Sequence, residues 1–162
     1  KPHARERVLS FMHPTADVLG SGYQANQSLI AVGSGGFLGR GFGQSVQKFG
    51  YLPEPVGDSI FAVFAEEFGF LGSCVLVIAF LLFALRGITL SIRAPDMFGV
   101  LLGSGITLLI ITQSFINIAV IVGILPYSGN PLIFVSHGGT ALLISLAAVG
   151  VLLNISRYQK KS

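Results

Sequence analysis

Hydrophobic residues gather into three long runs in this chain, and polar or glycine-rich stretches separate them. The runs cover residues 60–85, 98–125 and 139–156, with lengths close to the roughly 20 residues that an α-helix needs to cross a bilayer. In lipid, backbone N–H and C=O groups must pair within the segment, which excludes an open strand. The pattern therefore predicts an all-α integral membrane protein: a polytopic helix bundle fragment with three transmembrane helices.

The polar region over residues 1–59 precedes the first run. Its stretch YQANQSLIAV, residues 23–32, has the pattern of a short amphipathic helix that lies on the membrane surface. Glycines then accumulate in GSGGFLGRGFGQ, residues 33–44, and favour irregular backbone. This run has neither the Gly-Lys-Ser/Thr of a P-loop nor the spacing of a dinucleotide-binding fingerprint. No Cys or His spacing suits zinc.

Basic residues predict the orientation of the chain. The loop 86–97 and the tail 157–162 contain Lys or Arg, whereas the connection 126–138 contains none. Cytoplasmic segments carry the excess of Lys and Arg in membrane proteins. We therefore expect 86–97 and the C-terminus to be cytoplasmic, and 1–59 and 126–138 to be extracellular. The polar region has basic residues of its own, which form either a solvated surface or an anion site: Lys1, Arg5, Arg7, Arg40 and Lys48.

Composition agrees with a membrane protein and narrows the function. Hydrophobic residues make up 52% of the chain and charged residues 10%, against about a quarter charged in soluble domains. The net charge of +3 is too small to argue for nucleic acid, and 13 of the 17 aromatic residues are Phe, most of which lie in apolar runs rather than among basic residues. The chain begins with Lys1 rather than Met, so we expect it to be the C-terminal portion of a longer protein.

Three carboxylates stand beside or within the first apolar run, where charge is costly. Asp58 follows LPEPVG, residues 52–57, whose prolines stiffen the approach to the helix. It is a plausible N-cap, with Ser59 as the competing candidate. It is also placed to accept a proton from a sugar hydroxyl at the outer mouth of a bundle. Glu66 and Glu67 lie deeper, as buried polar residues expected to pair with a basic residue of a larger chain.

The second run contains polar and small residues that indicate packing against protein. Gln113 and Asn117 are spaced i, i+4 and share one helix face, so we expect both to be buried. They either form interhelical hydrogen bonds or line a polar path. Gly99 and Gly103 have the GxxxG spacing that permits close helix contact, a spacing that is common by chance in glycine-rich chains.

Three stretches carry a resemblance to a known family: GSGYQANQSLIAVGSGGFLGRGFGQSVQKFGYLPEPVGDSIFAVFAEEFGFLG, then QSFINIAVIVGILPYSGNPLIFVSHGG, then GVLLNISR. They resemble the SEDS family, the shape, elongation, division and sporulation proteins FtsW, RodA and SpoVE, and most of all the FtsW branch. The resemblance covers nearly the whole chain. It implies the C-terminal part of a ten-helix membrane protein, with its large fourth extracellular loop and helices eight to ten.

The resemblance also implies a function. Members are peptidoglycan glycosyltransferases of the bacterial plasma (inner) membrane that polymerise lipid II during cell division or cell-wall growth. The implied partners are lipid II, a class B penicillin-binding protein and membrane lipid, with no nucleic acid. Family members carry an essential aspartate at the end of the LPE loop, just before IFA, and that position is Asp58 here. Asp58 is thus the expected catalytic general base.

The remaining expected site residues surround the same mouth. Positive charge from Lys48, Arg40 or a divalent cation (Mg²⁺ or Mn²⁺) is expected to assist the leaving diphosphate. The other expected substrate-binding residues are Glu54, Ser136, His137 and Gly138.

This chain departs from the family pattern in places. Val56-Gly57 stands where members often have His-Thr, and SHGG replaces SYGG. Two alternative functions stay open: a flippase or transport-type subunit for lipid-linked precursors, and a non-catalytic divisome scaffold.

Overall fold

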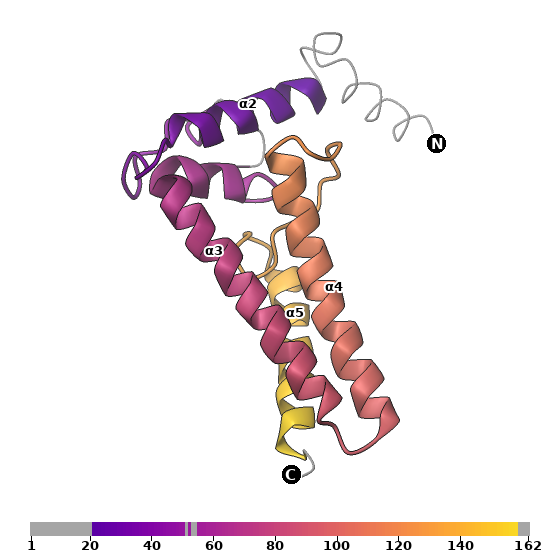
Figure 1. Ribbon diagram of the computed structural model, residues 1–162. Coiled ribbons are helices and arrows are strands. Elements are labelled where there is room, and N and C mark those ends of the chain that lie inside the picture. Colours follow the sequence, from indigo (N-terminus) through magenta and orange to yellow (C-terminus); the bar gives the residue numbers. More distant parts are fainter. Residues whose placement is uncertain (1–20, 51, 53–54, 159–162) are drawn as a thin grey trace.

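The computed structural model describes residues 21–50, 52 and 55–158 of the 162-residue chain. These residues form four helices: α2 (Ser21–Ser34), α3 (Ile60–Ile92), α4 (Met97–Ile121) and α5 (Gly139–Arg157) (Figure 1). The last three are long and apolar enough to cross a membrane. The predicted all-helical architecture with three candidate spans is therefore confirmed.

The helix α2 lies across one end of the bundle, above the start of α3 and the C-terminal end of α4 (Figure 1). The α3–α4 connection and the end of α5 lie at the opposite end. The helices α3 and α4 pack along each other, and α5 packs against both. The predicted amphipathic helix over 23–32 is thus part of α2, which adds two residues at each end.

The helix α3 is broken, which the sequence did not predict. Gly69 has φ 66° and ψ −164°, inside what was expected to be one straight span. Residues 60–68 form a short half-helix that lies beneath α2, and residues 70–92 form a long half that runs away from it (Figure 1). Glycine suits this position because an L side chain at such a φ is strained.

The glycine-rich segment braces this break. A broken helix leaves carbonyls unpaired at the end of one half and N–H groups unpaired at the start of the next. Here the backbone of residues 36–41 supplies both kinds of partner. Two N–H groups of the segment donate to the first half and two of its carbonyls accept from the second: Arg40 N to Glu66 O (3.0 Å), Gly41 N to Glu67 O (3.0 Å), Phe70 N to Gly36 O (2.9 Å) and Leu71 N to Phe37 O (3.2 Å).

Two glycines allow this close backbone contact. A Cβ atom at Gly35 would lie 2.0 Å from the carbonyl oxygen of Ala65, and one at Gly39 would lie 2.2 Å from that of Glu67. The irregular backbone predicted for residues 33–44 is present from residue 35 onward, whereas 33 and 34 belong to α2. The glycine run is therefore a packing surface for α3.

The observed bounds of α3 and α4 differ from the predicted ones. The helix α3 continues to Ile92, so the connection to α4 is only residues 93–96 instead of 86–97. Arg86 is exposed on the helix surface and does not end it. The helix α3 ends shortly before Pro95, because proline disfavours helical backbone in the residue that precedes it. The helix α4 ends at Ile121 rather than 125, where Gly123 (φ +75°) turns the chain.

Small residues mediate the contacts between the spans. A Cβ atom at Gly87 of α3 would lie 2.5 Å from Thr107 Oγ1 of α4, and one at Gly103 of α4 would lie 2.5 Å from Ser91 Oγ of α3. A Cβ atom at Gly99 would lie 3.8 Å from Ile155 Cγ2 of α5. The GxxxG pair of α4 therefore lies in helix contacts, where small residues let backbones approach. The apolar core lies at the other end of the bundle, around Ala31, Leu52, Phe61, Ala62, Val63, Phe80, Ile118, Ile121 and Leu132.

Candidate functional site

Asp58 lies in a short segment, residues 55–59, that leads into α3 and that we call the Asp58 strap. Asp58 itself is partly buried, and Val56 is 54% exposed. Three successive carbonyls of the strap accept hydrogen bonds from groups far along the chain. The bonds run from His137 N to Val56 O, from Ser136 Oγ to Gly57 O and from Asn117 Nδ2 to Asp58 O, each 2.8 Å.

Asn117 connects the strap to the loop 126–137. Its Nδ2 also donates to the carbonyl of Asn130 (2.6 Å), and the residue is only 2% exposed. These two bonds determine the orientation of the amide, because a flipped amide would point its oxygen at two carbonyl oxygens. Its Oδ1 is buried without a hydrogen-bond partner among the described residues.

The loop 126–137 closes over the strap. The Ser136 hydroxyl accepts a hydrogen bond from Leu132 N (2.7 Å) while it donates to the strap. Gly129 has φ +70°, and a Cβ atom there would lie 3.3 Å from Asp58 Oδ2. Glycine thus serves both the backbone conformation and the approach of this loop to the carboxylate.

Ser59, rather than Asp58, is the N-cap of α3. Its carbonyl accepts from Ala62 N at 2.9 Å, which begins the helix, and its side chain makes no capping bond. The Ser59 hydroxyl instead accepts from Gln24 of α2 (3.2 Å), whose amide also contacts the Tyr127 hydroxyl. The capping alternative for Asp58 was therefore wrong. Its carbonyl is engaged with Asn117, one residue too early to start the helix.

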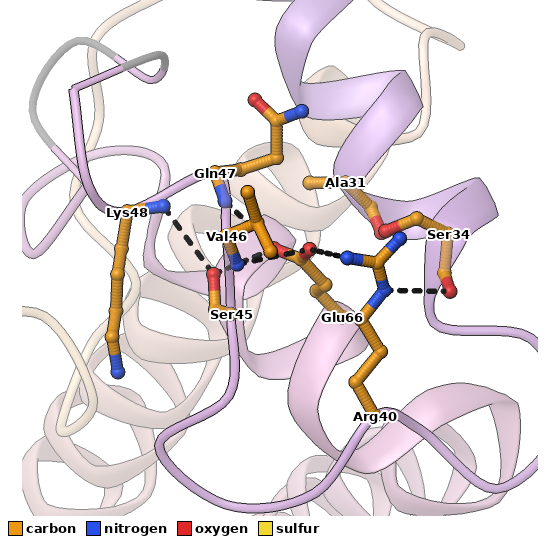
Figure 2. Close-up of polar contacts among 8 residues, drawn as sticks. All are labelled: Ala31, Ser34, Arg40, Ser45, Val46, Gln47, Lys48 and Glu66. Carbon is orange, nitrogen blue, oxygen red and sulfur yellow. Dashed lines mark hydrogen bonds and ion pairs between the residues drawn. The ribbon is translucent and has the colours of Figure 1, made fainter.

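Glu66 lies on the short half of α3 and is fully buried. Figure 2 shows its carboxylate between Arg40 on one side and the turn that contains Ser45 on the other. Four groups contact this carboxylate: Arg40 Nη1 (3.3 Å), Ser45 Oγ (2.6 Å), Val46 N (3.2 Å) and Gln47 N (3.3 Å). A buried carboxylate needs this degree of pairing and hydrogen bonding.

Glu67 makes the second ion pair, with Lys48 Nζ at 2.8 Å. The basic partners of both glutamates thus come from this chain rather than from another part of a larger one. The two basic side chains expected to meet a diphosphate, Arg40 and Lys48, already compensate buried carboxylates.

The other expected site residues are distributed differently. The His137 side chain is exposed, and Gly138 is the N-cap of α5. Gln113 is exposed among the described residues, on a side of α4 that no described element covers, so its burial beside Asn117 stays a prediction. Glu54 lies outside the described residues. Sequence reasoning missed Gly129, which the turn-forming YSGNP pattern could have indicated.

A metal site is not preformed in the part of the chain that the structure describes. No group of three or more His, Cys, Asp and Glu side chains there could hold a metal ion. A divalent cation held by one or two carboxylates and the phosphates of a substrate needs no such group, so the Mg²⁺ or Mn²⁺ expected from the sequence stays a prediction.

The chain matches a protein-family model and known relatives over nearly its whole length. The family model for FtsW, RodA and SpoVE, described as "Cell cycle protein", matches residues 1–161. Stage V sporulation protein E of Bacillus subtilis (strain 168) is 48% identical over 98% of this chain and 43% of its own length. A probable peptidoglycan glycosyltransferase FtsW of Synechocystis sp. (strain PCC 6803) is 48% identical over 100% of this chain and 41% of its own length.

A solved structure agrees with the fold. It is a chain of a peptidoglycan synthase complex that coordinates polymerization and crosslinking, with a TM-score of 0.77 and 27% identity. The match covers 100% of this chain and 44% of that one. The chain thus spans less than half the length of the relatives it matches, and those relatives carry both FtsW and SpoVE names. By sequence and by fold, the chain belongs to the SEDS family of FtsW, RodA and SpoVE proteins.

Proposed function

We propose that the protein containing this chain is a peptidoglycan glycosyltransferase that polymerises lipid II. One observation carries the proposal: relatives described as probable peptidoglycan glycosyltransferases FtsW are 44–48% identical over 96–100% of the chain. That coverage includes the Asp58 strap and the loop 126–137. The geometry adds a partly buried aspartate, Asp58, whose backbone carbonyl is held by Asn117 at one end of a membrane helix bundle.

In the proposed reaction, the 4-hydroxyl of the acceptor GlcNAc attacks the anomeric carbon of the donor MurNAc. A new C–O bond forms, the bond to the diphosphate oxygen breaks, and undecaprenyl diphosphate leaves with the bonding electrons. Asp58 takes the proton of the attacking hydroxyl. General-base catalysis of this kind contributes on the order of 100- to 10,000-fold.

Arg40 is the better placed of the two basic residues to contact the diphosphate as well. Its side chain is 42% exposed although it is paired with Glu66, against 27% for Lys48. Its contacts to Glu66 and to the Ser34 carbonyl use Nη1 and Nε. A guanidinium has five N–H donors, so it can hold a carboxylate and still face an anion.

The end of the bundle with the Asp58 strap is proposed to face outward. Arg86, Arg93 and Arg157 belong to the opposite end of the three spans, as expected for a cytoplasmic side. Arg40 and Lys48, at the strap end, are neutralised by buried glutamates. We further infer a class B penicillin-binding protein as partner, since the solved relative belongs to a complex that coordinates polymerization and crosslinking.

The test compares two carboxylates at opposite ends of the bundle. Asp58→Asn in the full-length protein should reduce lipid II polymerisation by about 100-fold or more, because the base is lost while the side chain keeps its size. Asp96→Asn removes the same charge from the exposed start of α4 and should leave polymerisation unchanged. Gel separation of glycan strands from purified lipid II measures both. Full polymerisation by Asp58→Asn would rule out the general-base function.

A further inference from the structure

The hydrogen bonds at the Asp58 strap converge on its backbone from three separate places. A helix side chain, a loop hydroxyl and a loop N–H each hold one of three successive carbonyls. We propose that Asn117 and Ser136 are positioning residues, which set where the Asp58 carboxylate lies. The inference rests on the proposed function and names how its general base is held in place.

Asn117 donates its hydrogen bond to the backbone carbonyl of Asp58 itself. The carbonyl carbon that it holds is bonded directly to the Cα atom that carries the carboxylate side chain. Fixing that carbonyl therefore fixes the direction in which the side chain leaves the backbone. The anchor itself is rigid, because Asn117 lies on α4, is 2% exposed and also holds the carbonyl of Asn130.

Ser136 connects the strap to a closed turn of the loop. Its backbone N–H donates to Leu132 O at 2.9 Å, its hydroxyl accepts from Leu132 N, and the same hydroxyl donates to Gly57 O. A serine hydroxyl can donate only one hydrogen bond, and here it donates that bond to the Gly57 carbonyl. Ser136 was expected to bind substrate, and this geometry gives it a positioning function instead.

The strap lies before the regular helical hydrogen bonds of α3, which begin only at Ile60, and Val56 within it is 54% exposed. Residues 56–58 therefore depend on these anchors for their position. Proton abstraction requires the base within about 3 Å of the hydroxyl oxygen. A displacement of about 1 Å at a reacting group can cost on the order of 100-fold in rate. Loosening the strap should therefore lower kcat and leave substrate affinity nearly unchanged.

The experiment uses the full-length protein and lipid II as the probe. Asn117→Leu keeps the approximate shape and removes both donors, and Ser136→Ala removes one hydroxyl from a partly buried site. Each should reduce kcat about 10- to 100-fold with KM changed less than about 2-fold. Ser136→Thr retains a hydroxyl and should restore most of the loss. Asn154→Leu makes the same substitution at an exposed position near the C-terminal end of α5, opposite the strap, and is the matched control with unchanged kcat.

The outcomes separate the two proposals. If Ser136→Ala and Asn117→Leu retain full kcat while Asp58→Asn is inactive, positioning is wrong and the proposed function stands. If Asp58→Asn is fully active, the proposed function itself fails. If Asn117→Leu does not fold, Ser136→Ala and Ser136→Thr decide alone. Equal losses in those two variants, or a loss only in thermal stability with normal kcat per folded molecule, would also overturn positioning.

Discussion

The break in α3 and the Asp58 strap lie at the same end of the bundle, yet the contacts that hold their acidic residues involve different atoms. At the break, the side chains of Glu66 and Glu67 are buried and compensated by Arg40 and Lys48. At the strap, the protein holds the backbone of Asp58 through its carbonyl. Charge-compensated carboxylates in the interior stabilise the fold, whereas the anchors at the strap act on the backbone that carries the proposed general base.

The comparison also explains why charge is tolerated in the first apolar run. Glu66 and Glu67 do not lie within a straight membrane span, because Gly69 ends the short half of α3 just beyond them. The glycine-rich segment then supplies both the backbone partners of the break and the basic side chains. Substitutions at the break should therefore affect stability, and substitutions at the strap should affect catalysis.

The largest expected effect on stability is at Gly39, in the glycine-rich segment that pairs with the break in α3. Gly39→Ala places a Cβ atom 2.2 Å from the Glu67 carbonyl oxygen at a φ of +83°. The clash and the strain together should cost roughly 4 kcal/mol or more, the range of the most damaging substitutions. Thermal unfolding in detergent measures the loss. Gly105→Ala, with open space around an exposed helical position, is the control and should stabilise slightly. Equal stability of the two variants would contradict the close packing.

An intermediate effect is expected at the buried carboxylate. Glu66→Ala removes the acceptor of four contacts and should cost about 3 kcal/mol, the low end for a broken buried pair. The low end applies because water can hydrate the Arg40 side chain, which is 42% exposed, once its partner is gone. Glu66→Gln keeps an acceptor and should cost about 1 kcal/mol. The kcat per folded molecule should stay constant in both. A selective loss of kcat in Glu66→Gln would move Glu66 from the fold to the active site.

The smallest effect is expected at Lys48. Its Nζ lies 2.8 Å from Glu67, and the Glu67 side chain is 7% exposed, against 1% for Glu66. Lys48→Ala should cost about 1 kcal/mol, and 1 M salt should shrink the difference from the unmodified protein. Denaturant titration at low and high salt measures both quantities. A cost as large as that of Glu66→Ala would show that the two ion pairs contribute equally to the stability of the fold.

Local patterns account for what could be predicted from the chain. Long apolar runs must form helices in lipid, so the three spans were recognisable without coordinates. The amphipathic pattern over residues 23–32 predicted the central part of α2. The break at Gly69 was not recognisable, because glycine is common in membrane helices. Gly72 and Gly87 lie in the same helix, where Gly69 alone has non-helical backbone angles. Nothing local distinguishes the glycine that breaks the helix from the two that do not.

The amino-acid sequence by itself determined the three membrane helices, the end at which Asp58 precedes the first of them, and the surplus of basic residues in the segments at the other end. Only the tertiary structure decided which groups hold Asp58 and which neutralise the glutamates. Asn117 and Ser136 reach the strap from 59 and 79 residues away, and Ser45 reaches Glu66 from 21 residues away. Helix formation depends on neighbours along the chain, whereas these partners are set by how whole segments pack.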